Sequence, residues 1–157
     1  MTRQICSPEL PPGYILRPAY ALDAGAIREM VYAEPLDPTQ LHWSQFWVIE
    51  CNGRLVACGQ LRRFTGVQEL GSLVVAPGWR AQGLGIRLGK HLIEQATEPL
   101  YLACGARLVP FYARLGFVPI PWLALPCPLK LKFGFSILAT TMLLRHLVFM
   151  QYLFPHQ

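Results

Sequence analysis

The chain is poor in charge, and its charges are unevenly distributed. Charged side chains make up 15% of its 157 residues, against about 25% in an average globular domain. Residues 1–98 carry nine basic and nine acidic side chains, whereas residues 99–157 carry five basic side chains and no acid. The net charge of +5 therefore lies in the last 59 residues. A local positive field favours an anionic partner, such as a phosphorylated cofactor, a nucleic acid or a membrane surface.

Cysteine and histidine patterns that hold disulfides or metals are also missing. The five cysteines are odd in number and include no C-x-x-C pair. This argues against a zinc ribbon or a disulfide framework and predicts a reducing, cytoplasmic location. The four histidines show no i, i+4 spacing, so we expect no metal site.

Hydrophobic runs are too short for a membrane span. The most apolar stretch, Phe133–Leu144, has twelve uncharged residues. As a helix it would span about 18 Å, against about 30 Å for the hydrocarbon core of a bilayer. The first residues meet prolines at positions 8, 11 and 12, which does not fit the apolar core of a secretory signal. We therefore expect neither a spanning helix nor export.

The residues that are present suit one globular domain. Hydrophobic residues make up 53% of the chain, and a length near 150 residues is typical of one domain with a full core. We therefore expect residues 1–157 to form a single domain. Apolar runs and alternation predict the following strands: 14–17, 46–50, 55–61 around an Asn52-Gly53 hairpin turn, 67–75, 100–104 and 116–118. Helical spacing predicts the following helices: 21–32, 83–96 and 109–115.

The last part of the chain is dominated by proline and then by apolar residues. Prolines at positions 119, 121, 126 and 128 predict an irregular connector over 119–128, because proline breaks regular helix. Beyond it we expect a helix over 135–144 and a strand over 148–154. We favour a tail that covers the domain and completes its sheet, over an exposed patch for a membrane or a partner.

The most informative segment follows the apolar strand end Leu73–Val75. It reads Arg80-Ala81-Gln82-Gly83-Leu84-Gly85 and opens a helix. Glycines let a ligand approach the backbone closely, and the free N–H groups of a first helical turn attract phosphate. The segment therefore predicts a pyrophosphate cradle. A plain tight turn is one alternative. A dinucleotide fold is another, although residues 99–110 lack the acid that NAD binding needs.

At these residues the chain resembles the GCN5-related N-acetyltransferase (GNAT) superfamily, whose signature is Q/R-x-x-G-x-G/A after an apolar strand. Downstream, Tyr112-Ala113-Arg114-Leu115-Gly116-Phe117 looks like the Y-x-x-x-G-F element of that family. The resemblance spans residues 14–118. It implies an α/β (α+β) fold with a mixed, mostly antiparallel sheet, flanking helices and a splayed central strand pair. Residues 119–157 would then be an atypical extension that completes the sheet.

The resemblance also implies an activity. It predicts an acetyl-CoA-dependent N-acetyltransferase that acetylates a primary amine by direct attack in a ternary complex. The residues expected to bind acetyl-CoA lie on the central strand and in the cradle: Leu73, Val74, Val75, Arg80, Ala81, Gln82, Gly83, Leu84, Gly85 and Ile86. A strand bulge near Leu73–Val75 would free a backbone N–H for the thioester carbonyl. The partners are acetyl-CoA and an amine acceptor, with no metal and no nucleic acid; an oligomer is possible.

Two residues are expected to move protons. At pH 7, deprotonating the acceptor costs about 4.6 kcal/mol for a lysine and about 1.4 kcal/mol for an α-amine. The resemblance assigns the role of general base to Glu69, acting through a water molecule. The alternative is that Glu69 is a solvated carboxylate or forms a salt bridge to Arg62 or Arg63. In that case bulk water would be the base. It assigns to Tyr112 the role of general acid, which donates a proton to the leaving thiolate. The alternative is that Tyr112 only packs its helix against the sheet.

Several other residues receive weaker interpretations. Trp43 and Trp47 are candidates to line an acceptor pocket with Glu34 and Asp37, or else belong to the core. Arg87 on the helix after the cradle fits a solvated face better than a phosphate contact, and we expect Cys104 to be a buried small hydrophobe rather than a nucleophile. Two other functions stay open: a non-catalytic acyl-CoA-binding module, and a membrane-surface protein that uses the basic, apolar tail.

Overall fold

A computed structural model describes residues 10–139 and 147–154. By its internal contacts the chain forms two compact units. The first, called the N-terminal unit, comprises Met1–Gln60 and Ser72–Glu94. The second, called the C-terminal unit, comprises Leu61–Gly71 and Gln95–Gln157.

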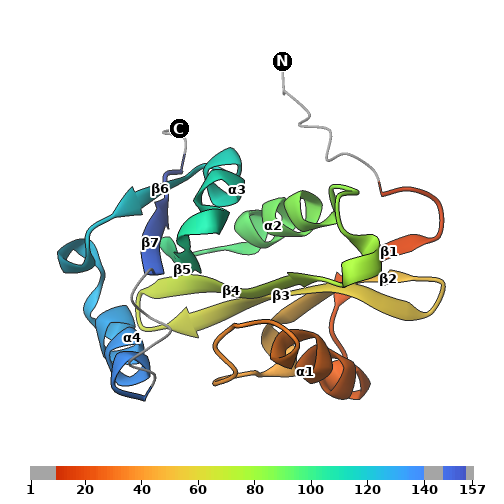
Figure 1. Ribbon diagram of the computed structural model, residues 1–157, viewed down its shortest axis with the longest axis horizontal. Coiled ribbons are helices and arrows are strands. Elements are labelled where there is room, and N and C mark those ends of the chain that lie inside the picture. Colours follow the sequence, from red (N-terminus) through yellow and green to blue (C-terminus); the bar gives the residue numbers. More distant parts are fainter. Residues whose placement is uncertain (1–9, 140–146, 155–157) are drawn as a thin grey trace. The chain divides into compact units, whose positions relative to one another are not determined.

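The described residues contain seven strands hydrogen-bonded in the order β1-β2-β3-β4-β5-β7-β6 (Figure 1). Their bounds are β1 Tyr14–Pro18, β2 Phe46–Cys51, β3 Arg54–Phe64, β4 Val67–Val75, β5 Leu100–Gly105, β6 Phe117–Ile120 and β7 Leu147–Tyr152. The β1/β2, β2/β3, β5/β7 and β6/β7 pairs are antiparallel, and the β4/β5 pair is parallel. The helices are α1 Ala24–Tyr32, α2 Leu84–Gln95, α3 Val109–Arg114 and α4 Cys127–Ala139. The expectation of a mixed, mostly antiparallel sheet with flanking helices is confirmed.

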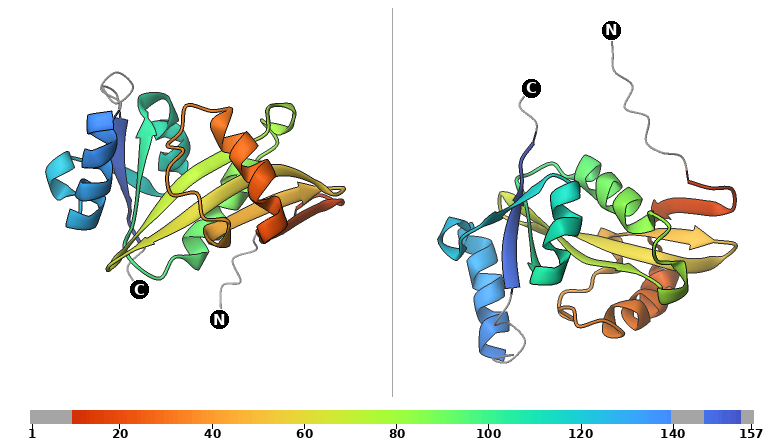
Figure 2. Two further views of the ribbon diagram at one scale, coloured as in Figure 1. Left: turned by 90° about the horizontal axis from the view of Figure 1, so that it is seen from below. Right: turned by 45° about the horizontal axis from the view of Figure 1, so that its top comes forward.

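In the N-terminal unit α1 and α2 cover opposite faces of β2 and β3 (Figures 1 and 2). Successive strand side chains point to opposite faces. Phe46 and Val48 accordingly pack in one apolar cluster with Ile27 and Val31 of α1. The Trp47 ring instead packs edge-on against His91 of α2, with 4.2 Å between the ring centroids. The alternation of β2 thus seats one helix on each side of the sheet.

The hairpin between β2 and β3 turns at Asn52 and Gly53, as the sequence predicts. Both residues have positive φ, 48° and 81°, which is the conformation of the two-residue turn that matches strand twist.

In the C-terminal unit β7 lies between β5 and β6. The ring of Phe149 on β7 packs against Phe133 of α4, with 5.3 Å between the ring centroids. The ring of Tyr152 packs against Phe117, with 5.4 Å between the centroids. The strand expected over 148–154 is therefore present, and both of its neighbours belong to the C-terminal unit.

The prediction that prolines prevent regular helix throughout 119–128 is wrong at its end. Helix α4 begins at Cys127, with Pro128 in its first turn, where proline's missing N–H has no helical partner to lose. Pro119 lies in β6, the last strand of the order, where an edge position tolerates proline. The helix expected over 135–144 starts eight residues earlier, and positions 140–146 lie outside the described residues.

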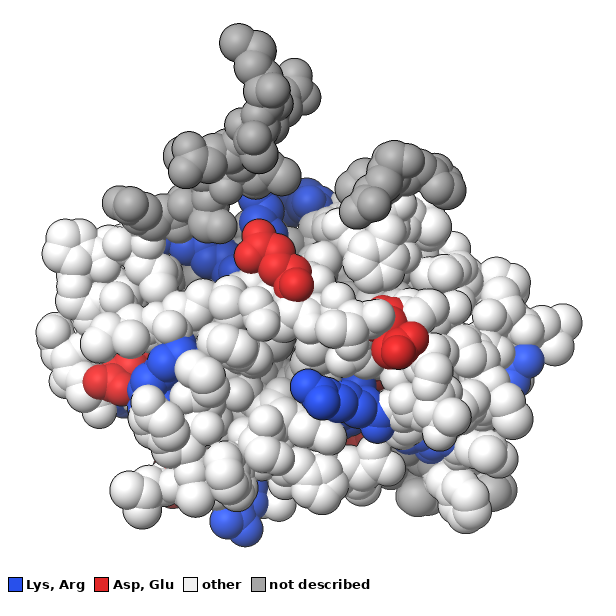
Figure 3. Space-filling model, turned by 180° about the vertical axis from the view of Figure 1, so that it is seen from behind, with Lys and Arg blue, Asp and Glu red and all other residues white. Residues whose placement is uncertain are grey.

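The surface reflects the low charge of the sequence. On the face shown in Figure 3, charged side chains form small groups, several with a basic side chain beside an acidic one, and wide uncharged areas lie between the groups. Among the described helices, none has both the length and the apolar composition that a membrane crossing requires.

Candidate functional site

The loop before α2 has the backbone shape of an anion cradle. Ala81 and Gly83 adopt positive φ, 61° and 77°, and the first intrahelical bond, from Arg87 N to Gly83 O, is 3.1 Å long. The N–H groups that precede this bond have no partner within the helix. At the positive end of the dipole of a twelve-residue helix, such donors favour a phosphate.

The side chains of the cradle are held by neighbours in the same unit. The Arg80 guanidinium pairs with Glu34, and its Nε donates to the Val75 carbonyl at 2.9 Å. The Gln82 side chain accepts a hydrogen bond of 3.0 Å from the Tyr14 hydroxyl. Arg80 therefore ties the cradle to the end of β4, and the backbone N–H groups remain as the main donors to an anion.

Arg87 differs from the solvated side chain that the sequence favours. It is half-buried, and its Nη1 is buried without a hydrogen-bond partner among residues 10–139 and 147–154. A buried cationic donor without a partner is costly. This atom is therefore a second feature, besides the cradle backbone, that suits an anionic ligand.

Strand β4 is irregular next to the expected thioester position. Ser72 adopts φ 50° in the interior of the strand, a conformation that side-chain-bearing residues rarely take in a regular ladder. The parallel ladder with β5 covers only Gln68–Leu100 and Glu69–Tyr101. An interruption of this kind exposes backbone groups that a continuous ladder would pair. It lies directly before Leu73–Val75.

Tyr112 lies on α3 among aromatic neighbours in the C-terminal unit. It is buried, and its ring packs edge-on to Phe111 and Phe117 at 5.0 and 6.0 Å. Burial, with a smaller contribution from nearby Cys104, raises the pKa of Tyr112 above its usual value. The phenol is therefore protonated at neutral pH, and the raised pKa makes it a weaker acid than an exposed tyrosine.

Glu69 belongs to a buried cluster of three charges, called here the Arg62–Glu69–Lys132 cluster. Arg62 Nη1 lies 3.1 Å from Glu69 Oε1, and Lys132 Nζ lies 2.6 and 2.5 Å from the two carboxylate oxygens. All three side chains are 3–4% exposed. The ion pair with Arg62, one of the alternatives that the sequence left open, is present.

No local pattern in the sequence indicated Lys132, which lies 63 residues after Glu69 and reaches it from α4. Gly71 is the one local hint, since a Cβ at this position would collide with the Arg62 guanidinium. This glycine leaves the space that the buried arginine fills.

The other residues that the sequence singled out do not form one site in the structure. Burial raises the pKa of Cys104 to about 11, which disfavours a nucleophilic thiolate. Trp43 lines a cavity with Arg28 and four other residues of the N-terminal unit, whereas Trp47 faces α2. Glu34 and Asp37 are not among the residues that line this cavity. No group of three metal-ligating side chains occurs in the part of the chain that the structure describes.

Comparison with known proteins agrees with this arrangement. A family model described as an acetyltransferase (GNAT) domain matches residues 42–119. The fold resembles N-acetylglutamate synthase from Neisseria gonorrhoeae complexed with coenzyme A and N-acetyl-glutamate, with TM-score 0.73 and 19% identity, over 88% of this chain and 34% of that one. The chain thus spans about a third of that enzyme's length.

Two other solved structures match over nearly their whole length. Rv2747 from Mycobacterium tuberculosis, in complex with CoA, has TM-score 0.75 and 18% identity, over 90% of this chain and 99% of that one. Naa50 from Arabidopsis thaliana, in complex with a bisubstrate analogue, has TM-score 0.66 and 13% identity, over 90% and 99%. These solved structures agree with the chain in fold, and the family model matched by residues 42–119 shows that the chain belongs to the GNAT superfamily of acetyltransferases.

Proposed function

We propose that the chain is an acetyl-CoA-dependent N-acetyltransferase that acetylates a primary amine by direct attack in a ternary complex. The observation that carries the proposal is the cradle, with positive φ at Ala81 and Gly83 immediately before α2. The crystallised neighbours that contain CoA support the same ligand. An intact cradle by itself also fits a non-catalytic acyl-CoA-binding module, which the transfer experiment below distinguishes.

The donor substrate would be held mainly by backbone. The pyrophosphate of acetyl-CoA fits the N–H groups of residues Gln82–Ile86, with Arg80 and Ala81 shaping the loop. The half-buried Arg87 guanidinium adds a positive charge. We assign the pantetheine arm and the thioester to Leu73, Val74 and Val75, where the irregularity at Ser72 interrupts the strand. A backbone N–H at this point would stabilise the oxyanion that forms as the amine attacks.

Bond making and proton transfer then follow in order. The amine nitrogen forms a bond to the acetyl carbon, the carbon–sulfur bond breaks, and the thiolate takes a proton from the Tyr112 hydroxyl, which regains a proton from water. The two oxygens of Glu69 accept hydrogen bonds from Lys132, and one also from Arg62, so the ion pairs support a structural role for this carboxylate. We therefore assign the proton released by the amine to water.

Gly83→Val is expected to weaken binding of acetyl-CoA about tenfold or more. A β-branched residue at φ 77° is strained by about 1–3 kcal/mol, which the cradle would relieve by changing shape. Titration calorimetry of the folded variant with acetyl-CoA checks this.

Gly53→Val is the matched control for Gly83→Val. Gly53 has φ 81°, and a Cβ at either glycine meets no atom within 4 Å, so both variants carry the same kind of strain. Equal affinity in the wild-type and Gly83→Val proteins would contradict the assignment of the cradle. If both variants lose the same amount of affinity for acetyl-CoA, the effect comes from general destabilisation and not from the cradle.

The activity itself is tested by incubating the protein with acetyl-CoA and a panel of primary amines, with release of free thiol as the readout. We expect thiol release that depends on the amine. A protein that binds acetyl-CoA but releases no thiol with any amine would support the non-catalytic module.

A further inference from the structure

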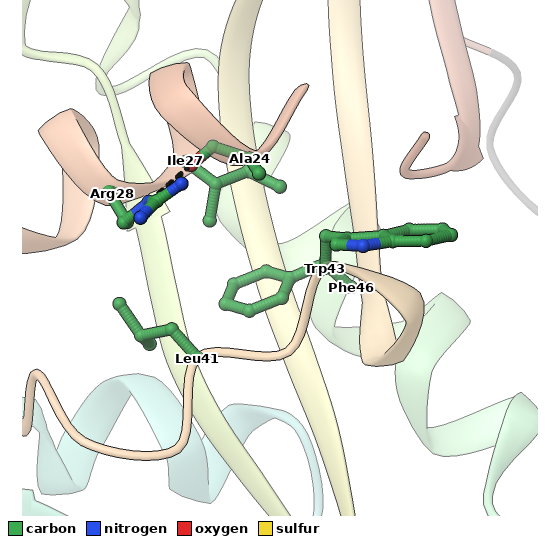
Figure 4. Close-up of a pocket in the computed structure, with 6 residues that line it drawn as sticks. All are labelled: Ala24, Ile27, Arg28, Leu41, Trp43 and Phe46. Carbon is green, nitrogen blue, oxygen red and sulfur yellow. Dashed lines mark hydrogen bonds between the residues drawn. The ribbon is translucent and has the colours of Figure 1, made fainter. Parts of the chain in front are cut away.

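A cavity in the N-terminal unit has none of the cradle residues in its lining. It has a volume of about 140 Å³ and is lined by Ala24, Ile27, Arg28, Leu41, Trp43 and Phe46. Figure 4 shows Ile27 and Arg28 of α1 on one side of the hollow and Leu41 on the other, with the Phe46 ring beside them. Five of the six lining residues are apolar, and a cavity of about 150 Å³ is large enough to hold benzene, so this one has room for a side chain of similar size.

The walls of the cavity connect it to β4. Ile27 and Phe46 are 2% and 1% exposed and belong to the apolar cluster that also contains Val74. Val74 lies in the stretch to which the thioester is assigned. A molecule with its apolar part in this cavity would therefore sit in the same unit as the donor's expected binding strand.

The one charged residue of the lining is Arg28. Its Nε donates to the Ala24 carbonyl at 3.2 Å, which holds the side chain along α1 (Figure 4). In residues 10–139 and 147–154, no acid pairs with this guanidinium. Two acids of the following loop have other partners, since Glu34 pairs with Arg80 and Asp37 accepts from Thr39. Arg28 thus offers an unneutralised fork of donors beside five apolar lining residues.

We propose that this cavity selects the acceptor, and that the acceptor is an amine with a benzene-sized or branched apolar side chain and a carboxylate, which Arg28 binds. A guanidinium binds a carboxylate through two parallel hydrogen bonds, and the apolar walls gain from burying the side chain. The inference rests on the proposed function. It adds the chemical class of the acceptor, an amino acid such as phenylalanine.

The test uses three probes that differ at one group: L-phenylalanine, L-phenylalaninamide and 2-phenylethylamine. We expect wild-type kcat/KM to be about tenfold to a hundredfold higher for phenylalanine than for the other two, because only phenylalanine carries the charge that Arg28 binds. Arg28→Gln should remove this preference, and Arg28→Lys should restore part of it. Arg54→Gln, which changes another exposed arginine of the same unit, should leave it unchanged.

A binding measurement separates this inference from the proposed function. L-phenylalanine is titrated into the wild-type and Arg28→Gln proteins in the presence of coenzyme A, with heat as the readout. Weaker binding to Arg28→Gln supports the carboxylate site even if no transfer occurs, which would count against the proposed function alone. Equal affinity for both proteins, or equal use of all three amines, would overturn the inference.

Discussion

Tyr112→Phe is expected to lower the rate of acetyl transfer by about 10²–10⁴-fold, because a general acid contributes an acceleration of this size. The change removes only the hydroxyl, so the ring contacts with Phe111 and Phe117 remain. We expect the affinity for acetyl-CoA and the thermal stability to change little. Single-turnover kinetics, with calorimetry on the same preparations, separates the transfer step from binding.

Tyr101→Phe is the matched control for this experiment. Tyr101 is also a buried tyrosine of the C-terminal unit, 8% exposed against 7% for Tyr112, but it packs in the apolar cluster with α4. Loss of the Tyr101 hydroxyl should leave the rate of acetyl transfer within a few-fold of wild type. Equal rates for Tyr112→Phe and wild type would return Tyr112 to a packing role.

Glu69→Gln is expected to cost stability rather than chemistry. Removing one partner of a buried ion pair leaves an uncompensated charge, typically at about 3–5 kcal/mol, and here Arg62 and Lys132 would both lose the carboxylate. We therefore expect a clear fall in the free energy of unfolding, measured by urea denaturation. Lys132→Met should also destabilise the protein, and the two changes should combine non-additively because the residues are in contact.

Glu50→Gln supplies the control for the ion-pair cluster. Glu50 pairs with Arg17 at side chains that are 22% and 17% exposed, and Arg17 keeps Asp23 as a partner. We expect a loss of no more than about 1 kcal/mol there. For Glu69→Gln, a folded, fully stable protein that loses the acidic limb of the pH–rate profile would instead make Glu69 the base.

Local signals in the sequence predicted most elements of the fold. The Asn52-Gly53 turn and the glycine-rich start of α2 could be predicted because their backbone conformation depends only on neighbouring residues. The start of α4 was missed because proline excludes a helix interior but not a first turn, and Pro128 stands in a first turn. The sequence also could not show that β7 inserts between β5 and β6, since that pairing joins segments far apart in the chain.

The candidate site was predictable to a similar degree. The cradle could be found because its donors are backbone groups of one continuous segment. The lysine that reaches Glu69 from α4 and the position of Arg28 at the cavity could not be found, because both depend on which side chains meet after folding. Isolated charged residues carry no periodic signal that would reveal such contacts.

The central claim is the transfer of an acetyl group from coenzyme A to an amine. It is tested most directly by incubating the protein with acetyl-CoA isotopically labelled in its acetyl group and a primary amine, followed by mass spectrometry and a thiol assay. The account predicts the label in an amide of the acceptor, in an amount equal to the free thiol released. Thiol release without labelled amide, or binding of acetyl-CoA without either product for every amine tried, would contradict it.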